Sequence, residues 1–405
     1  MKKVSVIVFV SIAALGAAVL GACNPIESGE ISAYEKEIKA AVEGYVPDVV
    51  YATYGSLAQA GKDLYEDLDA MKSKGVNALS QADIDKACAD FLAARALWEA
   101  SEAFLFGAAT DFSIDPHIDS WPLDASRLAI NLSNKAAVEK LAEEGMDAID
   151  LIGESALGFH GIEFILFRDG KNRTLASLKA EETAIEFKGT GVTGEEEIIF
   201  AAAVAEDLMT ALYQLNVSWN PAAPQEQKDA VEAAERNCTV NGTDRTYGEN
   251  MLGATAAGST YATWQQVAQT IIDAGCANIA NEVFSSKMGM AFSGEDPSYI
   301  ESPYSKKSFV DFKDNILSIQ YSLYGAKGAS EAKNNSLMSF LKKNHKEDAA
   351  VLESKLAAAL NALDACIGSG KAFVDDPKAK CVETAIDAIS ELNDALGKAA
   401  SDIKD

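Results

Sequence analysis

One short segment, residues 158–167, restricts the fold more than any other part of the chain. It is almost entirely apolar, yet it contains His160 and Glu163, three residues apart. On a helix, residues i and i+3 lie on the same face, so both polar side chains would share one apolar surrounding. Buried polar groups need hydrogen-bond partners or a bound ion. The pair therefore predicts a polar site inside a helical core, in a chain that has only three histidines.

The rest of the chain also has the pattern of helices. Alanine, leucine, glutamate and lysine are abundant, and few β-branched residues alternate with polar ones, which favours helices over strands. A loop is expected at 108–123 and a polar, glycine-containing linker at 168–194. The predicted helices cover 34–74 (interrupted near Pro47), 80–107, 124–131, 134–145, 147–167, 198–215, 225–237, 261–288, 308–324, 330–344, 346–366 and 380–402. The predicted fold class is all-α.

Length predicts more than one domain. The hydrophobic share of 48% is ample for a core, and the 405 residues of the chain exceed the usual size of a single core. The linker at 168–194 is the natural boundary. We therefore expect two helical-bundle domains, 23–185 and 195–405, packed side by side. Their similar size suggests an ancient duplication, although the sequence has no clear repeat.

The N-terminus predicts export. Lys2 and Lys3 precede an apolar stretch, residues 4–19, which is too short to span a membrane and is typical of a signal peptide. The residues Leu20-Gly21-Ala22-Cys23 resemble the cleavage box of bacterial lipoproteins. This resemblance implies that residues 1–22 are removed and that Cys23 carries lipid, which anchors the protein to a membrane of the cell envelope. An ordinary secretory signal is the alternative.

The charge of the chain excludes one class of partner. The net charge is −26, and removal of Lys2 and Lys3 with residues 1–22 leaves −28. Such a surface repels nucleic acid and attracts cations. We therefore expect no nucleic-acid partner.

Five cysteines follow Cys23, and none has the spacing of a metal site. Outside the cytoplasm disulfides form readily. Cys366 and Cys381 flank a loop between two predicted helices, so a disulfide between them would connect a helical hairpin. A bond between Cys238 and Cys276 is a weaker prediction. Cys88 would then be unpaired and buried.

Two further groups of acidic residues are candidates for the same site. On the helix at 80–107, Glu102 lies at the edge of the apolar stripe that contains Trp98, while Glu99 and Arg95 lie one step further round. The alternative for Glu99 is an exposed i,i+4 ion pair with Arg95. In the loop at 108–123, Asp119 lies just before Trp121-Pro122. Asp111 of this loop and Asp124 just after it are explained as turn or cap residues, and His117 as an exposed side chain.

These blocks together resemble the imelysin family. The resemblance is carried by residues 98–104 (WEASEAF), 118–123 (IDSWPL), 158–164 (GFHGIEF, with the family's Gly-x-His-x-x-Glu motif) and 301–305 (ESPYS), where Tyr304 replaces an expected Phe. The Trp-Glu-x-x-Glu pattern of the first block and residues 115–119 (DPHID) are also similar to the periplasmic component of bacterial elemental-iron uptake systems. The resemblance implies two helical bundles with the His-Glu motif near their interface, in envelope proteins of iron acquisition. The same family was named for an insulin-cleaving membrane peptidase.

The residues favour metal binding over peptidase chemistry. A helical zinc peptidase needs His-Glu-x-x-His or its inverse, and this chain has Phe164 where a second histidine would stand. One histidine with several carboxylates suits iron, with zinc and manganese as alternatives, and haem is a further alternative. The expected ligands are His160 and Glu163, joined by Glu99, Glu102 and Asp119, with Trp98, Trp121, Arg127, Glu301, Ser302 and Tyr304 in support.

Three functions follow from this pattern. The first is a metal-binding envelope lipoprotein of iron or haem-iron acquisition, with iron-transport proteins of the envelope as partners. The second is a metallopeptidase in which Glu163 or Glu102 is the base that activates a metal-bound water. The third is a scaffold or receptor partner in which the His160–Glu163 pair is a buried hydrogen-bonded element of the core.

Overall fold

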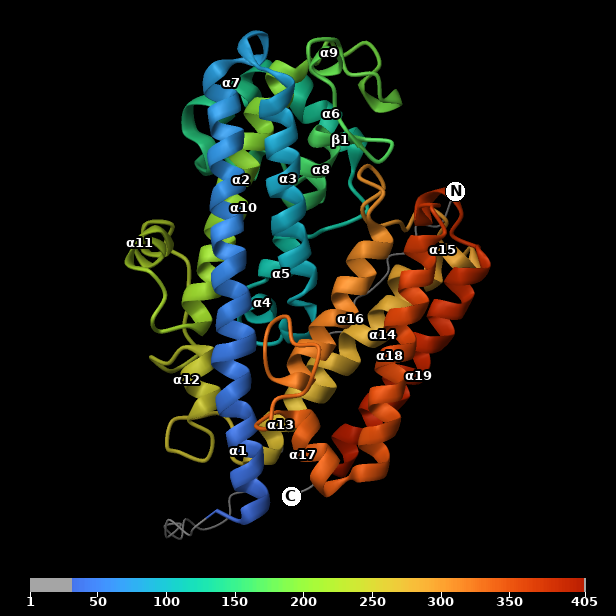
Figure 1. Ribbon diagram of the computed structural model, residues 1–405. Coiled ribbons are helices and arrows are strands. Elements are labelled where there is room, and N and C mark those ends of the chain that lie inside the picture. Colours follow the sequence, from blue (N-terminus) through green and yellow to red (C-terminus); the bar gives the residue numbers. More distant parts are fainter. Residues whose placement is uncertain (1–30, 404–405) are drawn as a thin grey trace, which may run out of the picture.

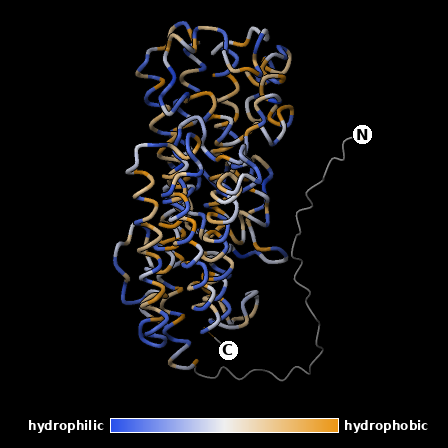
Figure 2. Tube along the Cα trace, turned by 90° about the vertical axis from the view of Figure 1, so that its right-hand side faces the viewer, coloured by the Kyte–Doolittle hydropathy of each residue, from blue (hydrophilic) through white to orange (hydrophobic). Residues whose placement is uncertain are grey.

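The computed structural model describes residues 31–403; the predicted signal peptide and Cys23 lie outside the described residues. The prediction of an all-α fold is confirmed. Among the described residues, strands are limited to one antiparallel hairpin, β1 (Phe167–Arg168) and β2 (Lys171–Asn172). The helices form an elongated molecule (Figure 1). Figure 2 shows apolar and polar positions interleaved along these helices over its whole length.

The first group of helices surrounds α10 (Gly194–Trp219), which packs against α2 (Ala52–Lys74) and α8 (Gly158–Leu166). α3 (Gln81–Glu99) packs against α2 in turn (Figure 1). The sequence fixes the start of α3, because Ser80 and Asp83 form a capping box that satisfies free backbone N–H groups. By length and composition α10 could cross a membrane, but 83% of its most apolar window is buried by neighbouring helices. α10 is thus a core helix of this group.

The second group consists mainly of helices from the last third of the chain. α18 (Lys346–Gly368) and α19 (Lys380–Asp402) form an antiparallel hairpin that packs against α16 (Ser308–Tyr324) and the π-helical segment η7 (Thr270–Ala277) (Figure 1). α16 also packs against α3 of the first group. This contact between α16 and α3 brings together the segments that carry the candidate site.

The remaining elements are shorter and connect or cover these two groups. The α-helices are α1 (Ala33–Tyr45), α4 (Ala108–Asp111), α5 (Ile114–Ile118), α6 (Ala125–Ser133), α7 (Lys135–Glu144), α9 (Leu175–Leu178), α11 (Gln225–Ala233), α12 (Tyr247–Leu252), α13 (Trp264–Gln269), α14 (Asn278–Glu282), α15 (Gly289–Ser293) and α17 (Leu337–Asn344). The 3-10 and π segments are η1 (Val46–Tyr51), η2 (Val76–Ala78), η3 (Glu102–Phe104), η4 (Gly145–Leu151), η5 (Glu154–Ala156), η6 (Ile185–Phe187), η8 (Val283–Lys287) and η9 (Phe373–Asp375).

One continuous hydrophobic core runs through both groups of helices. α10, which lies after the predicted boundary at 185–195, packs against α2 and α8 from before it. The division of the chain into domains 23–185 and 195–405 stays a prediction.

Several predicted elements have different bounds in the structure. The expected loop at 108–123 contains the short helices α4 and α5, and the linker at 168–194 contains the β-hairpin, α9 and η6. The helix expected at 147–167 is divided into η4, η5 and α8. Gly153 and Gly158 cause this division, because their φ angles of 88° and 64° cannot continue a right-handed helix.

The predicted disulfides are wrong: all five cysteines in the described part of the chain are free. The α18–α19 hairpin does bring the Cys366 and Cys381 thiols together, but as an unbonded pair. Cys238 packs on a small cluster formed with α11, whereas Cys276 lies in the main core, so these two cannot meet. Cys88 is buried, as predicted.

Candidate functional site

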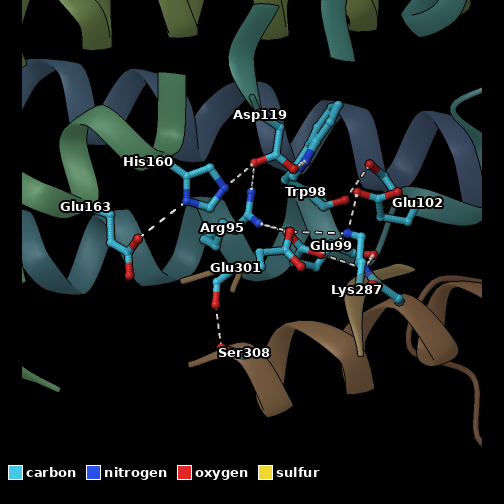
Figure 3. A network of polar contacts seen from close by, with 12 residues as sticks. Arg95, Trp98, Glu99, Glu102, Asp119, His160, Glu163, Lys287, Glu301 and Ser308 are labelled. Carbon is cyan, nitrogen blue, oxygen red and sulfur yellow. Dashed lines mark hydrogen bonds and ion pairs between the residues drawn. The ribbon is translucent and has the colours of Figure 1, made fainter. Parts of the chain in front are cut away.

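A cluster of buried charged side chains lies where α3, α8, η8 and the segment before α16 meet (Figure 3). We call it the central cluster. Its members are Arg95 and Glu99 of α3, Glu102 of η3, Asp119 after α5, His160 and Glu163 of α8, Lys287 of η8, Glu301, and Asp311 of α16. All of them are at most 7% exposed.

Gly158 allows α8 to begin next to Asp119. Its φ angle is +64°, and a Cβ atom on this residue would lie 2.0 Å from the carbonyl oxygen of Ile118. Only glycine tolerates both the backbone conformation and this close approach. The glycine of the Gly-x-His-x-x-Glu motif therefore positions His160 against the residue that follows Ile118.

The imidazole ring of His160 lies between two carboxylates. Nδ1 is 3.4 Å from Oε2 of Glu163, whose other oxygen accepts a 2.7 Å hydrogen bond from the backbone N–H of Ser305. Nε2 lies 3.1 Å from Oδ1 of Asp119, but the two groups are not aligned for a hydrogen bond. We therefore treat this second contact as an ion pair. Burial alone would lower the pKa of His160, but the contacts with Asp119 and Glu163 raise it to about 9.

Asp119 receives several donors at once. Trp98 donates its indole N–H to Oδ2 over 2.7 Å, and the Arg95 guanidinium pairs with Oδ1. Burial alone would raise the pKa of Asp119, but Arg95 and His160 hold it well below its ordinary value. Asp119 is therefore an anion at neutral pH and connects α3 to α8.

Arg95 and Lys287 provide the fixed positive charge of the cluster. Nη2 of Arg95 lies 2.5 Å from Glu99 and 2.6 Å from Glu301. Nζ of Lys287 lies 3.2 Å from Glu301, 3.6 Å from Glu102 and 3.7 Å from Glu99. Burial would lower the pKa of Lys287, but these carboxylates raise it well above its ordinary value. The lysine therefore keeps its charge inside the protein.

Carboxyl groups outnumber cationic groups in the central cluster by six to three. Burial is the main reason why the pKa of Glu301 is raised to about 7 and the pKa values of Glu102 and Asp311 lie well above their ordinary values. These carboxyl groups therefore take up protons more readily than exposed ones. A bound cation would compete with protons for them, as metal ions do in carboxylate sites.

The cluster also contains buried polar atoms that lack hydrogen-bond partners. These atoms are Nε of Arg95, Oε1 of Glu99, Nε2 of His160, Oε2 of Glu301 and Oδ2 of Asp311, and Oδ1 of the neighbouring Asn315 also has no partner. Buried polar atoms of this kind need an ion, a water or another explanation. Within residues 31–403, both groups of ligand atoms close enough to hold one metal ion lie in this cluster, each within 4.8 Å: Asp119 with His160 and Glu301, and Glu99 with Glu102 and Asp119.

A small cavity connects the cluster to the surface. It has a volume of about 170 Å³ and is lined mainly by acidic groups, Glu102, Asp115, Asp119 and Glu282, together with Lys287. Trp121 lies at its side, 4.2 Å from the ring of Tyr299 between centroids. Burial and the charge of Asp119 raise the pKa of Asp115 to about 7. We call this cavity the acidic opening.

Most of the residues predicted for the site meet in the central cluster, including Glu99, which is fully buried and is not on an exposed rim. Ser302 lies beside Asp311. Two supporting residues do not join. Tyr304 packs edge-on against Phe164, and Arg127 bonds to the carbonyl oxygen of Ile152. Tyr304 is close to Glu301 and Ser302 in sequence but does not join the cluster with them, because the chain turns at Ser302, where φ is +50°.

Sequence reasoning missed the two cations at the centre of the cluster. From the sequence, Arg95 is expected only as the partner of Glu99 in an exposed ion pair. Lys287 carries no motif, and it reaches the cluster through tertiary packing of η8 against α16 and α19. A usable signal existed only for Arg95, which precedes Glu99 by one helical turn beside the apolar stripe that contains Trp98.

Fold and site together define an all-α protein that encloses a histidine–carboxylate cluster between two groups of helices. The chain matches the family model described as Imelysin over residues 50–396, and it belongs to the imelysin family. It is 25% identical to iron-regulated protein A of Synechococcus elongatus over 356 residues, which cover 88% of this chain and 83% of that protein.

Two solved structures have the same fold. One is a protein described as an iron-regulated protein A precursor from Parabacteroides distasonis, with a TM-score of 0.71, 24% identity, and coverage of 93% of this chain and 97% of that chain. The other is an imelysin-like protein from Psychrobacter arcticum, with a TM-score of 0.54, 13% identity, and coverage of 90% and 94%.

Proposed function

We propose that this protein binds a metal ion in the central cluster and serves iron acquisition in the cell envelope. One observation carries the proposal: the buried Nε2 of His160 lacks a hydrogen-bond partner and lies in a group with Asp119 and Glu301 whose ligand atoms are within 4.8 Å of one another. An excess of buried carboxyl groups surrounds them. This arrangement is costly without a cation and favourable with one.

The two carboxylates on the His160 ring have different roles in this proposal. Glu163 faces Nδ1 and is itself held by the N–H of Ser305. This is the arrangement of a carboxylate that orients a metal-binding histidine from behind. Nε2 would then face the ion, together with Asp119 and Glu301. Because the ring is protonated without metal, ion binding would release its proton.

The donor set suits iron. One imidazole nitrogen and several carboxylate oxygens match a hard or borderline cation, with zinc and manganese as alternatives. The name of the Synechococcus relative, iron-regulated protein A, supports iron among these. Haem is the alternative form of the ligand.

The geometry favours binding over peptide cleavage. A metallopeptidase must bring a peptide bond to the ion and to a base, yet Glu163 and His160 are each 1% exposed and Glu102 is 7% exposed. The acidic opening, at about 170 Å³, is below the size of pockets that hold even drug-sized ligands, roughly 300 Å³ and above. A scaffold role without metal is the remaining alternative.

The membrane anchor belongs to the same proposal. Cys23 would carry lipid and hold the protein at a membrane of the envelope, where iron-transport proteins would exchange the ion with it. Replacement of Cys23 by Ala should move the protein from the membrane fraction to the soluble fraction of the envelope. Retention in the membrane fraction would contradict the lipid anchor.

Calorimetry on the protein from residue 24 onward tests metal binding. We expect one-site binding of Fe²⁺ under anaerobic conditions, or of Zn²⁺ or Mn²⁺, that is lost in His160→Ala. The matched control is His117→Ala, because His117 pairs with Asp207 outside the central cluster. Well-folded protein that binds none of the three ions would contradict the proposal and favour the scaffold role.

A further inference from the structure

We propose that Lys287 is an internal counter-ion that a small, bare metal cation displaces when it reaches the central cluster through the acidic opening. This inference rests on the proposed metal-binding function and deepens it. It assigns the acidic opening as the route of the ion and Lys287 as the cation that the ion displaces. It also assigns the ligand as a bare ion and not a haem or a peptide.

Lys287 occupies the place where an arriving cation would first meet buried carboxylates. Its ammonium group lies 3.2–3.7 Å from Glu301, Glu102 and Glu99. These three carboxylates are divided between the two possible metal-ligand groups, one of which contains Glu301 and the other Glu99 and Glu102. A divalent cation on either group would lie close to the ammonium, and like charges at such distances in a poorly solvated site repel strongly.

The position of Lys287 on the route distinguishes it from Arg95. Lys287 lines the acidic opening together with Glu102 and Asp119, whereas Arg95 is not among the residues that line it. Arg95 also holds Asp119, Glu99 and Glu301 at the same time. An ion that arrives from the surface therefore meets Lys287 first, and Arg95 would remain to hold the carboxylates in position.

The segment that carries Lys287 has an irregular backbone that can accommodate movement. Lys287 is the last residue of η8, a π-helical segment, and the N–H of Met288 bonds to the carbonyl oxygen of Val283, five residues earlier. π-Helical turns are less stable than α-helical ones and are frequent at functional sites. Withdrawal of the lysine side chain thus requires a local change in one turn and no movement of whole helices.

The opening selects by charge and size. Glu102, Asp115, Asp119 and Glu282 line it, and a cleft lined by one sign of charge concentrates counter-ions at its mouth. Its volume of about 170 Å³ admits a partly hydrated ion but lies below the roughly 300 Å³ of the smallest pockets for drug-sized ligands, so a haem would not enter.

The first test compares metal affinities of variants at Lys287. We expect Lys287→Gln to bind Mn²⁺ and Fe²⁺ at least about 10-fold more tightly than the natural chain, because the repelling charge is gone. Lys287→Arg keeps the charge and should bind no more tightly than the natural chain. The matched control is Lys62→Gln, which removes the same charge from an exposed ion pair with Glu226 and should change the affinity less than about two-fold.

The outcomes separate this inference from the proposed function. Absence of binding in both the natural chain and a folded Lys287→Gln variant would overturn the proposed function. Binding by the natural chain with equal or weaker binding by Lys287→Gln would overturn the role of Lys287 and leave the proposed function intact. Competition of haem with Mn²⁺ for the site would overturn the assignment of a bare ion.

A second measurement keeps the inference testable if Lys287→Gln does not fold. Glu282 lines the opening but lies in neither metal-ligand group. Glu282→Gln should slow Mn²⁺ association at least about three-fold in stopped-flow fluorescence, with a smaller effect at high salt. Glu331→Gln, at an exposed glutamate outside the opening, should leave the rate unchanged. Equal rates for both variants would overturn the route.

Discussion

Residues 31–403 contain two networks of largely buried charged side chains, and the two differ in their ratio of carboxyl groups to cations. In the hairpin network, next to β1 and β2, Arg168 and Arg173 face Glu182 and Glu197. Arg173 contacts both oxygens of Glu197 at 2.8 and 2.9 Å, and Arg168 contacts Glu182 at 2.8 Å. Glu182 also accepts two backbone N–H groups. Each carboxylate therefore has a cation of its own, whereas in the central cluster carboxyl groups outnumber cations by six to three.

This difference distinguishes a structural network from the proposed binding site. A balanced buried network needs nothing further and holds the chain segments on which it lies. An unbalanced one is costly to bury until protons or a cation complete it. The same residue types, arginine and glutamate, thus have different consequences in the two places because of their number. The acidic opening is lined by Lys287, Glu102 and Asp119 of the central cluster.

Breaking the hairpin network should have the largest effect on stability. Arg173→Met would leave Glu197 and Glu182 buried beside a single cation, and we expect a loss of about 3–5 kcal/mol in the free energy of unfolding. Urea denaturation measures this loss. The double variant Arg173→Met/Glu197→Met should lose less than the single variant. Added metal should restore nothing, and full restoration by metal would mean that this network is also a metal site.

Gly158→Ala should be next in size and should affect the central cluster alone. The alanine would have to adopt a φ of +64°, and its Cβ would collide with the Ile118 carbonyl oxygen. The combined cost is about 3 kcal/mol. Gly242→Ala is the matched control, because Gly242 has a φ of +76° with nothing within 4 Å of its Cβ position. It should lose only the conformational part, about 1–2 kcal/mol. Equal losses would contradict the role of the close contact in placing His160.

Metal should stabilise the unbalanced network and leave the balanced one unaffected. At a free-ion concentration of about 100 times Kd, binding should add about 2.7 kcal/mol to the free energy of unfolding. Thermal melts with ion and with chelator measure it. The gain should be absent in His160→Ala and present in His117→Ala. An equal gain in both variants would locate the ion outside the central cluster.

Much of the fold and part of the site followed from local sequence. Helical periodicity gave the long helices, and the Ser80–Asp83 capping box marked the start of α3 within one residue. The motif on α8 indicated that His160 and Glu163 are buried, because the residues around them on the helix are apolar and the whole helix is therefore expected inside the core. The interruption at Gly153 and Gly158, inside the helix predicted at 147–167, was missed, because glycines that need positive φ are not distinguishable from helix glycines by composition.

The charge balance of the site could not be predicted, since it depends on residues far apart in sequence. Lys287 meets Glu99 across nearly two hundred residues, and nothing near Lys287 in sequence distinguishes it from an exposed lysine. The expected Cys366–Cys381 disulfide is a second case in which sequence alone was insufficient. Sequence placed the two thiols on adjacent helices correctly, but proximity alone does not form the bond, and the structure has them free.

The smallest expected effect concerns a charged group near the surface that belongs to neither network. Nε2 of His117 lies 2.6 Å from Asp207, whose other oxygen lies 2.5 Å from Arg236. The hydrogen bond with Asp207 raises the pKa of His117 above its ordinary value of 6.5, against the effects of burial and Arg236. The pair therefore stabilises the fold fully below that ordinary value, and the contribution is lost as pH rises through the raised pKa.

His117→Gln should accordingly cost more at about pH 5.5 than at about pH 9, with a difference below roughly 1 kcal/mol because the pair is partly exposed. Urea denaturation of both proteins at the two pH values, with chelator present, measures this difference without any contribution from metal. A cost that does not change with pH would mean that His117 contributes through packing alone. In that case, any pH dependence of the natural chain in this range would come from other groups, among them Glu197 of the hairpin network and Glu301 of the central cluster, whose pKa values burial raises to about 7.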